Sequence, residues 1–294
     1  MKSGYVAVIG RANAGKSTLV NVLVGEKVAI VSPKPQTTRE RILGVYTSND
    51  SQIAFIDTPG LYKADNLLNA YMQKTVSDSV SDVDAIMFVL DAHEGLAEKD
   101  VQFIKKFQKQ DVPFILVLLK IDIMPESLLV SELKQLEDLG VEIVPVSARK
   151  GKNVKELLKV IKSVLPDGEK LFDEDIISDR STKFMLSEIM REKILLKFEK
   201  EIPHGVAIII NKFALNESGS AYDINLDIIC EKPNHKAILI GKQGSKIKEV
   251  STFARVDMEK FLGKKVFLTT YVKVKEDWRN SKYLLKQHGY GDGV

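Results

Sequence analysis

The chain has 294 residues, of which 44% are hydrophobic and 28% charged, a composition typical of a globular protein with two domains of ordinary size. Its single cysteine, Cys230, excludes an internal disulfide framework and fits a reducing compartment. No stretch approaches the roughly 18 apolar residues of a membrane span, and the N-terminus lacks the apolar core of a signal peptide, so we expect a cytoplasmic protein.

Charge is distributed unevenly along the chain. Residues 1–180 contain 23 Lys and Arg against 26 Asp and Glu, a net charge of −3, whereas residues 181–294 contain 20 against 14, a net charge of +6. A weakly acidic first part joined to a basic second part indicates that the second part meets a polyanion. Solvated lysine-rich surfaces produce the same imbalance, so charge alone does not establish such a partner.

Short apolar stretches alternate with amphipathic ones from Tyr5 to Pro166. Strands are expected at 5–10, 41–47, 51–57, 84–92, 113–119 and 141–148. Apolar residues at spacings of three and four predict helices at 16–26, 97–110, 125–140 and 153–165. Strands that are apolar throughout and separated by helices indicate an α/β fold, in which a mostly parallel sheet is covered on both faces and binds ligands at the carboxyl ends of its strands.

Residues 166–179 interrupt this alternation with Pro, Gly and an acidic cluster, which predicts a linker. Ser181 is then expected to cap a helix at 182–200. The remaining elements are predicted as strands at 206–215 and 221–231 joined by a polar hairpin loop, a helix, a short glycine loop, a helix ending at Leu262, a strand at 265–275 and a final helix. The order α-β-β-α-α-β predicts a smaller α+β domain.

The sequence "GRANAGKS" (10–17) matches the phosphate-binding pattern G-x-x-x-x-G-K-[ST] and lies between a predicted strand and a predicted helix, as this pattern requires. Its glycines allow backbone N–H groups to wrap a phosphate, and the helix N-terminus adds a favourable dipole. Lys16 would reach the β- and γ-phosphates, and the Ser17 hydroxyl would bind Mg²⁺. The pattern predicts a nucleoside triphosphate site without identifying the base.

Three later motifs, each at the end of a predicted strand, resemble those of the translation-factor-like GTPases: "DTPG" (57–60), "LLKID" (118–122) and "SARKG" (147–151). The resemblance implies that Asp57 holds Mg²⁺ through water while the Gly60 N–H faces the γ-phosphate. It also implies guanine as the base, with the stem of Lys120 along the ring, Asp122 pairing with N1–H and N2–H₂, and the Ala148 N–H contacting O6. Adenine would leave the hydrogen bonds of Asp122 unmade.

The sequence departs from the family pattern N-K-x-D at Leu119, where the family has asparagine. Leucine cannot hydrogen-bond the base or tie this loop to the phosphate-binding loop. Either Leu119 merely extends the apolar strand, or the guanine site is weaker and keeps its selectivity through Asp122. We expect a working but looser site.

Residues 32–44, "SPKPQTTRERILG", lie where a switch segment belongs. By resemblance, Thr38 closes on Mg²⁺ and the γ-phosphate in the triphosphate state; an ordinary exposed loop is the alternative. Many relatives orient the attacking water with a glutamine after "DTPG", but here the next residue is Leu61. Asn13 occupies the position at which related potassium-activated GTPases help coordinate K⁺, which would offset charge between the β- and γ-phosphates. Alternatively, Asn13 only satisfies a loop hydrogen bond.

The resemblance therefore defines candidate site residues by role. Catalysis is assigned to Lys16, Thr38, Asp57, Gly60 and Asn13, and Mg²⁺ coordination to Ser17, Thr38 and Asp57. The expected contacts of GTP are Gly10, Arg11, Ala12, Asn13, Ala14, Gly15, Lys16, Ser17, Thr18, Asp57, Thr58, Pro59, Gly60, Leu119, Lys120, Asp122, Ser147, Ala148 and Arg149.

A second glycine loop, "LIGKQGSKI" (239–247), fits the I-G-x-x-G-x-x-I pattern of the KH RNA-binding module. Its glycines permit close backbone approach, its lysines neutralise phosphates, and the flanking isoleucines anchor two helices. Such a module clamps about four nucleotides of single strand. Pattern, element order and basic charge together favour RNA binding over a plain helix–turn–helix, through Ile240, Gly241, Lys242, Gln243, Gly244, Lys246 and Lys248.

A GTPase domain followed by one KH domain resembles the Era family of bacterial ribosome-assembly GTPases over essentially the whole chain, and "PQTTRER" and "DTPGL" are also typical of that family. The resemblance implies a GTPase domain at 1–168, a linker at 169–180 and a KH domain at 181–294. It implies Mg²⁺-dependent hydrolysis of GTP to GDP and phosphate, binding near the 3′ end of small-subunit (16S) ribosomal RNA during 30S assembly, and peripheral contact with the inner membrane. We expect a monomer. The alternatives are an RNA-binding scaffold that binds guanine nucleotide with little turnover and, more distantly, an ATP-using enzyme.

Overall fold

A computed structural model describes residues 1–61, 64–109 and 111–290 of the chain. The backbone forms two compact units. The described residues of the first unit are 1–31, 38–61, 72–109 and 111–179, and those of the second unit are 32–37, 64–71 and 180–290. Residues 291–294, which end the predicted KH domain, lie outside the described residues.

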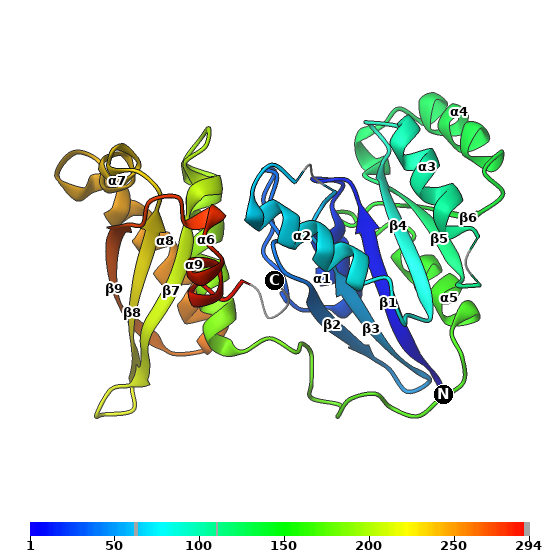
Figure 1. Ribbon diagram of the computed structural model, residues 1–294. Helices are drawn as coiled ribbons and strands as arrows, with labels where there is room; N and C mark the ends of the chain where they lie inside the picture. Colours follow the sequence, from blue (N-terminus) through cyan, green and yellow to red (C-terminus); the bar gives the residue numbers. More distant parts are fainter. Residues whose placement is uncertain (62–63, 110, 291–294) are drawn as a thin grey trace. The chain divides into compact units, whose positions relative to one another are not determined.

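The first unit is built on the strands β1 (Lys2–Gly10), β2 (Ile42–Thr47), β3 (Ser51–Asp57), β4 (Ala85–Asp91), β5 (Phe114–Leu119) and β6 (Glu142–Val146), drawn as arrows in Figure 1. They form one sheet in the order β2-β3-β1-β4-β5-β6, in which β2 is antiparallel to β3 and the other neighbouring pairs are parallel. All residues of β3 and β4 are buried, as expected for strands covered on both faces. The predicted α/β fold with a mostly parallel sheet is confirmed.

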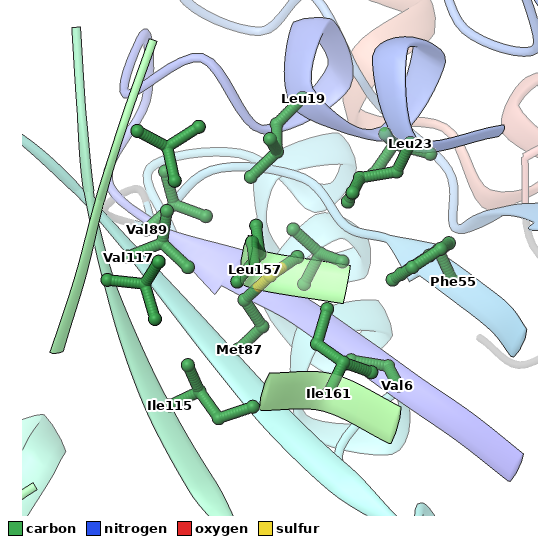
Figure 2. Packing of buried hydrophobic residues seen from close by; sticks show 14 of the residues in the cluster. Val6, Leu19, Leu23, Phe55, Met87, Val89, Ile115, Val117, Leu157 and Ile161 are labelled. Atoms are coloured by element: carbon green, nitrogen blue, oxygen red, sulfur yellow. The ribbon is translucent and has the colours of Figure 1, made fainter. Parts of the chain in front are cut away.

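Helices pack on both faces of this sheet: α1 (Lys16–Val24), α2 (Leu67–Asp78), α3 (Glu98–Phe107), α4 (Glu126–Glu137) and α5 (Val154–Val164). Leu19 of α1 and Leu157 of α5 lie over one face, against apolar side chains of the central strands (Figure 2). Val76 of α2, Ile104 of α3 and Leu136 of α4 belong to the apolar cluster on the opposite face. Helix α2 was not predicted, because polar residues interrupt the apolar spacing of "LLNAYMQKTVSD".

The stretch predicted as a linker lies along the sheet of the first unit. Residues 169–179 form neither a helix nor a strand. The Val45 N–H donates to the Ile177 carbonyl oxygen at 3.0 Å. The Gln52 side chain donates to the Phe172 carbonyl oxygen at 2.9 Å. These bonds satisfy backbone groups of the segment and fix its path beside β2 and β3.

The second unit contains α6 (Thr182–Lys197), β7 (Ala207–Leu215), β8 (Ala221–Cys230), α7 (Pro233–Ile240), α8 (Ser245–Leu262), β9 (Lys265–Val274) and α9 (Lys282–Gln287). Its sheet has the order β7-β8-β9, with β7 antiparallel and β9 parallel to β8. The Ser181 hydroxyl accepts a hydrogen bond from the Phe184 N–H at 3.2 Å and so caps α6 as predicted. The elements follow the predicted order α-β-β-α-α-β.

The helices of the second unit bury their apolar faces in a core of their own. Leu186 and Ile189 of α6 lie in one buried cluster with Val250 and Ala254 of α8. This packing fixes α6 against α8, the helix that begins directly after the second glycine loop. Within the described ranges, no helix is long and apolar enough to cross a lipid bilayer.

Candidate functional site

The first glycine loop joins β1 to α1. Gly15 has a left-handed backbone (φ 101°), and α1 begins at the next residue, Lys16. The first N–H groups of a helix have no partner within the helix, so those of α1 are suited to an anion. The Lys16 ammonium donates to the carbonyl oxygens of Gly10 at 3.1 Å and Arg11 at 2.9 Å, which holds the charge across the loop.

The three predicted Mg²⁺ ligands lie together. The Ser17 hydroxyl donates to Asp57 Oδ2 at 2.6 Å and lies 2.8 Å from Thr38 Oγ1. The Thr38 hydroxyl is also 3.4 Å from Asp57 Oδ2. The other carboxylate oxygen, Asp57 Oδ1, is buried and has no hydrogen-bond partner among the described residues. One carboxylate and two hydroxyls fit Mg²⁺, which takes its remaining ligands from phosphates and water.

Two opposite charges are buried at this site. Burial lowers the pKa of Lys16 from 10.5 to about 8, and the nearby Asp57 carboxylate opposes this shift. Burial also raises the pKa of Asp57 from 3.8 to about 6, against the influence of Lys16 and of the Ser17 and Thr38 hydroxyls. Both shifts have the same cause, because a low-dielectric environment disfavours the charged form of either group. Phosphates beside Lys16 and a cation beside Asp57 would stabilise both charged forms.

The "DTPG" motif after β3 meets the phosphate-binding loop through its backbone. A Cβ atom on Gly60 would lie 2.7 Å from Ala12 Cα, so this close approach requires glycine. Leu61 and Arg11 form an isolated parallel bridge next to it. The loop that follows β3 is therefore held against the loop that follows β1, which places the Gly60 backbone beside the phosphate cradle.

The base-reading residues follow β5 and β6. Ser147, which is fully buried, donates its hydroxyl to Asp122 Oδ1 at 2.6 Å. This hydrogen bond lowers the pKa of Asp122, so the carboxylate is ionised at neutral pH and can accept from guanine N1–H and N2–H₂. Ser147 was predicted only as a nucleotide contact. The structure adds that it orients Asp122.

Leu119 contacts the phosphate-binding loop by packing. It is 2% exposed, and a Cβ atom on Gly15 would lie 2.7 Å from its Cδ2. The adjacent Lys120 ammonium donates to the Asn13 carbonyl oxygen at 2.8 Å and to Asp91 Oδ2 at 2.6 Å. Lys120 thus ties the base-reading loop to the phosphate-binding loop, a connection that the sequence analysis did not anticipate. Asp91 was not predicted as a site residue either. Its position as the acidic last residue of the apolar strand β4 could have indicated such a role.

Two residues of the predicted nucleotide motifs direct their side chains into the protein. Arg11 Nε lies 3.2 Å from a carboxylate oxygen of Asp100, which is 1% exposed. The Thr58 hydroxyl donates to the Val8 carbonyl oxygen at 2.8 Å. Only the backbones of Arg11 and Thr58 therefore remain for the nucleotide. The other predicted contacts lie at the end of β1, in α1 or in the loops after β1, β3 and β6: Gly10, Thr18, Ala12, Ala14, Pro59, Ala148 and Arg149.

The second glycine loop joins α7 to α8 in the second unit. Gly241, Gln243 and Gly244 have left-handed φ angles of 72°, 50° and 77°. A Cβ atom on Gly244 would meet nothing closer than 4.0 Å, so the space beside this residue is open to a ligand. Such a loop lets a nucleic-acid backbone approach the protein backbone closely.

The side chains around this loop divide into anchors and exposed cations. Ile240 and Ile247 are half-buried and pack against the core of the second unit, one from each helix. Lys242, Lys246 and Lys248 are exposed. The isoleucines fix the loop to the fold while the lysines surround it with positive charge, an arrangement suited to the phosphates of a single strand.

Known proteins show the same combination of loops. Residues 5–120 match the family described as 50S ribosome-binding GTPase, and residues 201–279 match the KH domain. GTPase Era of Clostridium kluyveri is 45% identical over 292 residues, which cover 99% of this chain and 99% of that protein. The chain belongs to the Era family of GTPases.

Other Era proteins are similarly close. Era of Alkaliphilus oremlandii is 46% identical over 291 residues, covering 98% of this chain and 99% of that protein. The crystal structure of an Aquifex aeolicus Era variant bound to GDP and AlF4− matches with a TM-score of 0.94 at 40% identity, covering 99% of this chain and 100% of the other. Era in complex with MgGDPNP and nucleotides 1506–1542 of 16S ribosomal RNA matches with a TM-score of 0.95 at 40% identity, covering 99% of both chains.

Membership of the Era family confirms the predicted resemblance, the GTPase activity and Mg²⁺ as the cofactor. It favours GTP hydrolysis over the two alternatives, a scaffold with little turnover and an ATP-using enzyme. The roles of individual site residues stay predictions, which the variants below address.

The first prediction concerns base recognition by Asp122. Asp122→Asn should weaken GTP binding by about 100-fold or more. The bond from N1–H loses its charged acceptor, and the new amide N–H₂ faces the N2–H₂ donor, where a hydrogen bond to a carboxylate worth about 1.5–3 kcal/mol had been. The variant should gain affinity for xanthosine triphosphate, whose O2 accepts from the new amide. Equilibrium titration with both nucleotides measures the exchange. Asp91→Asn is the control, because it weakens the ion pair with Lys120. In this variant the affinities for GTP and for xanthosine triphosphate should fall by the same factor. An unchanged preference in Asp122→Asn would contradict the assignment.

The second prediction concerns the pH dependence of Mg²⁺-assisted nucleotide binding. Since the pKa of Asp57 is raised to about 6, lowering the pH through this value should protonate the carboxylate and weaken binding at limiting Mg²⁺. Protons and Mg²⁺ compete for Asp57, so the midpoint should move to lower pH as Mg²⁺ is increased. Asp57→Asn, measured over the same range, reports the titration of the nucleotide itself. Identical pH profiles in the two proteins would rule out this role.

Proposed function

We propose that this Era-family GTPase is a switch whose nucleotide state controls its binding near the 3′ end of small-subunit ribosomal RNA, and that it assists assembly of the 30S particle. One observation carries the proposal: a candidate nucleotide site and a KH-type glycine loop occur in one chain that matches an RNA-bound Era over 99% of its length. The net charge of +6 in residues 181–294 supports a polyanionic partner.

Hydrolysis can be derived from the residues around the phosphates. Lys16 would balance the negative charge that develops on the leaving phosphate. Ser17, Thr38 and Asp57 would hold Mg²⁺, which supplies positive charge between the β- and γ-phosphates when bound. The Gly60 N–H would hydrogen-bond to the γ-phosphate and keep it in line with the attacking water.

A monovalent cation is proposed to complete the charge balance. The residue after "DTPG" is Leu61, whose apolar side chain cannot orient water. Asn13 has an exposed side chain and a left-handed backbone (φ 62°), and its carbonyl oxygen is held by Lys120. Its side-chain oxygen would bind K⁺ together with phosphate oxygens, which would place positive charge beside the γ-phosphate.

We further propose that the protein acts as a monomer in the cytoplasm. Any contact with the inner face of the cell membrane would be peripheral. The proposed hydrolysis of GTP depends on neither property.

The RNA function is tested by the double variant Gly241→Asp with Gly244→Asp. Two carboxylates would lie where phosphates are expected, so the affinity for an RNA of nucleotides 1506–1542 should collapse while GTP affinity persists. For the wild type, two to four phosphate contacts predict a slope of log K against log salt of about −1.5 to −3. Gly219→Asp with Gly263→Asp is the control, because these glycines also have positive φ. Their surroundings are open, as they are at Gly244, whereas a Cβ atom on Gly241 would lie 2.8 Å from Lys246 Cγ. Unchanged RNA affinity in the 241/244 variant would remove the KH assignment.

The potassium proposal is tested by single-turnover GTP hydrolysis in KCl and NaCl at equal ionic strength. The wild type should be faster in KCl, and Asn13→Gly should lose the difference. Glycine is chosen because it removes the side chain and tolerates the positive φ of this position without strain. Asn13→Asp, which keeps an oxygen ligand, should retain part of the stimulation. Equal wild-type rates, or a stimulation that survives in Asn13→Gly, would end the proposal.

A further inference from the structure

The segment that precedes Thr38 is folded into the second unit. Residues 32–37 belong to that unit, whereas Thr38 belongs to the first. The segment is a compact turn, in which the Thr37 hydroxyl donates to the Lys34 carbonyl oxygen at 2.6 Å and Gln36 has a left-handed backbone (φ 59°). The hydrogen bond and the left-handed residue fix the backbone conformation of residues 32–37. A movement of Thr38, the next residue, therefore requires a change in that conformation.

Arg191 of α6 fixes this turn through its backbone. The side chain is 1% exposed, and its guanidinium donates from Nη1 to the Gln36 carbonyl oxygen at 3.1 Å and from Nη2 to that of Thr37. Its Nε donates to Glu188 Oε1 at 2.7 Å, and Nη2 also pairs with the same carboxylate. Since the acceptors in the turn are backbone carbonyls, the hydrogen bonds of Arg191 depend on the backbone conformation at Gln36 and Thr37.

The Arg191–Glu188 pair is costly to bury. Removing an arginine and a carboxylate from water costs several kcal/mol per ion, and apolar residues of similar volume often stabilise a fold as well or better. The planar guanidinium can reach two carbonyl groups and a carboxylate at once, which a lysine cannot do. These properties suit a group that holds a segment in one geometry.

Helix α6 also packs against α8, the helix that follows the second glycine loop. Leu186 and Ile189, on either side of Glu188 in α6, share a buried cluster with Val250 and Ala254 of α8. The first residue of α8, Ser245, directly follows the glycine loop. A shift of α6 would therefore be transmitted through packed side chains to the helix that carries the exposed lysines.

We propose that Arg191 is a positioning residue that couples the two ligand sites of this protein. Arg191 holds the carbonyl groups of Gln36 and Thr37 on α6. When Thr38 moves to Mg²⁺ and the γ-phosphate, this connection shifts α6. The shift reaches α8 through the packing of the two helices and changes the RNA affinity of the 241–244 loop. This inference rests on the proposed switch function and assigns its coupling to one buried side chain.

The test is a thermodynamic cycle on the full chain. The affinity for RNA 1506–1542 is measured with GDP and with GDPNP bound, and the affinities for both nucleotides are measured with and without this RNA. The wild type should show a coupling factor of about 5–150, equal from either side because linkage is reciprocal. Glu188→Leu with Arg191→Met removes both charges at similar volume and should bring the factor to within twofold of 1, while GDP affinity without RNA changes less than about threefold.

Two further variants keep the outcome decisive. Lys183→Met removes an exposed cation from the same helix and should retain the wild-type coupling factor. Arg191→Lys keeps the charge beside Glu188 but loses the double contact, so it should lower the factor at least threefold; it decides the matter if the double variant does not fold. A wild type without coupling would refute the proposed switch. A coupled wild type whose Arg191 variants retain the full factor would overturn this inference alone.

Discussion

The nucleotide site depends on two opposite charges, Lys16 and Asp57, that the fold keeps away from water. Burial disfavours both charged forms, lowering one pKa to about 8 and raising the other to about 6. The protein offsets this cost with the carbonyl groups that accept from Lys16 and with the Ser17 and Thr38 hydroxyls around Asp57. Phosphates and Mg²⁺ complement the same two charges more fully than hydroxyls and carbonyls do. A site of this kind therefore gains most from a ligand that brings both, which is the chemical description of a magnesium-bound nucleotide.

The topology of the sheet explains why residues so distant in sequence meet. Parallel strands place their carboxyl ends at one edge, so the loops after β1, β3, β4, β5 and β6 converge there. This convergence also brings Leu119 and Lys120 against the phosphate-binding loop. Lys120 bridges Asn13 and Asp91, the latter from β4, and Leu119 packs on Gly15. Lys120 is the lysine of the family pattern itself, so only the packing of Leu119 on Gly15 stands where the asparagine of that pattern would connect the two loops. We therefore expect this loop to be better ordered than the sequence alone suggested.

Sequence reasoning worked where local pattern and chemistry coincide. The apolar strands, the Ser181 cap and the phosphate-binding loop (10–17) are all encoded by neighbours in the chain, and the structure has them where they were predicted. It failed for α2, whose apolar spacing is weak, because tertiary packing of residues such as Val76 overrides local preference there. The assignment of residues 32–37 to the second unit could not be predicted either. These residues contact Arg191, about 155 residues away, through their backbone carbonyl groups. Every residue has a carbonyl group, so the sequence does not indicate which of them accepts such a bond.

Gly60 of the nucleotide site and Gly244 of the second glycine loop differ in what surrounds their backbones. In the nucleotide site, the space beside Gly60 is filled by Ala12, so glycine there serves the packing of one protein loop on another. Beside Gly244 nothing lies closer than 4.0 Å, so glycine there keeps a left-handed turn open to a ligand. A nucleotide that reacts must be enclosed by loops of fixed geometry, because small displacements of its phosphates cost much of the rate. A ribonucleic acid strand that is only held can pass over an open loop, where lysines supply charge without fixing a reacting atom. One chain can thus carry two phosphate cradles without redundancy, since the first is shaped for chemistry and the second for reversible contact.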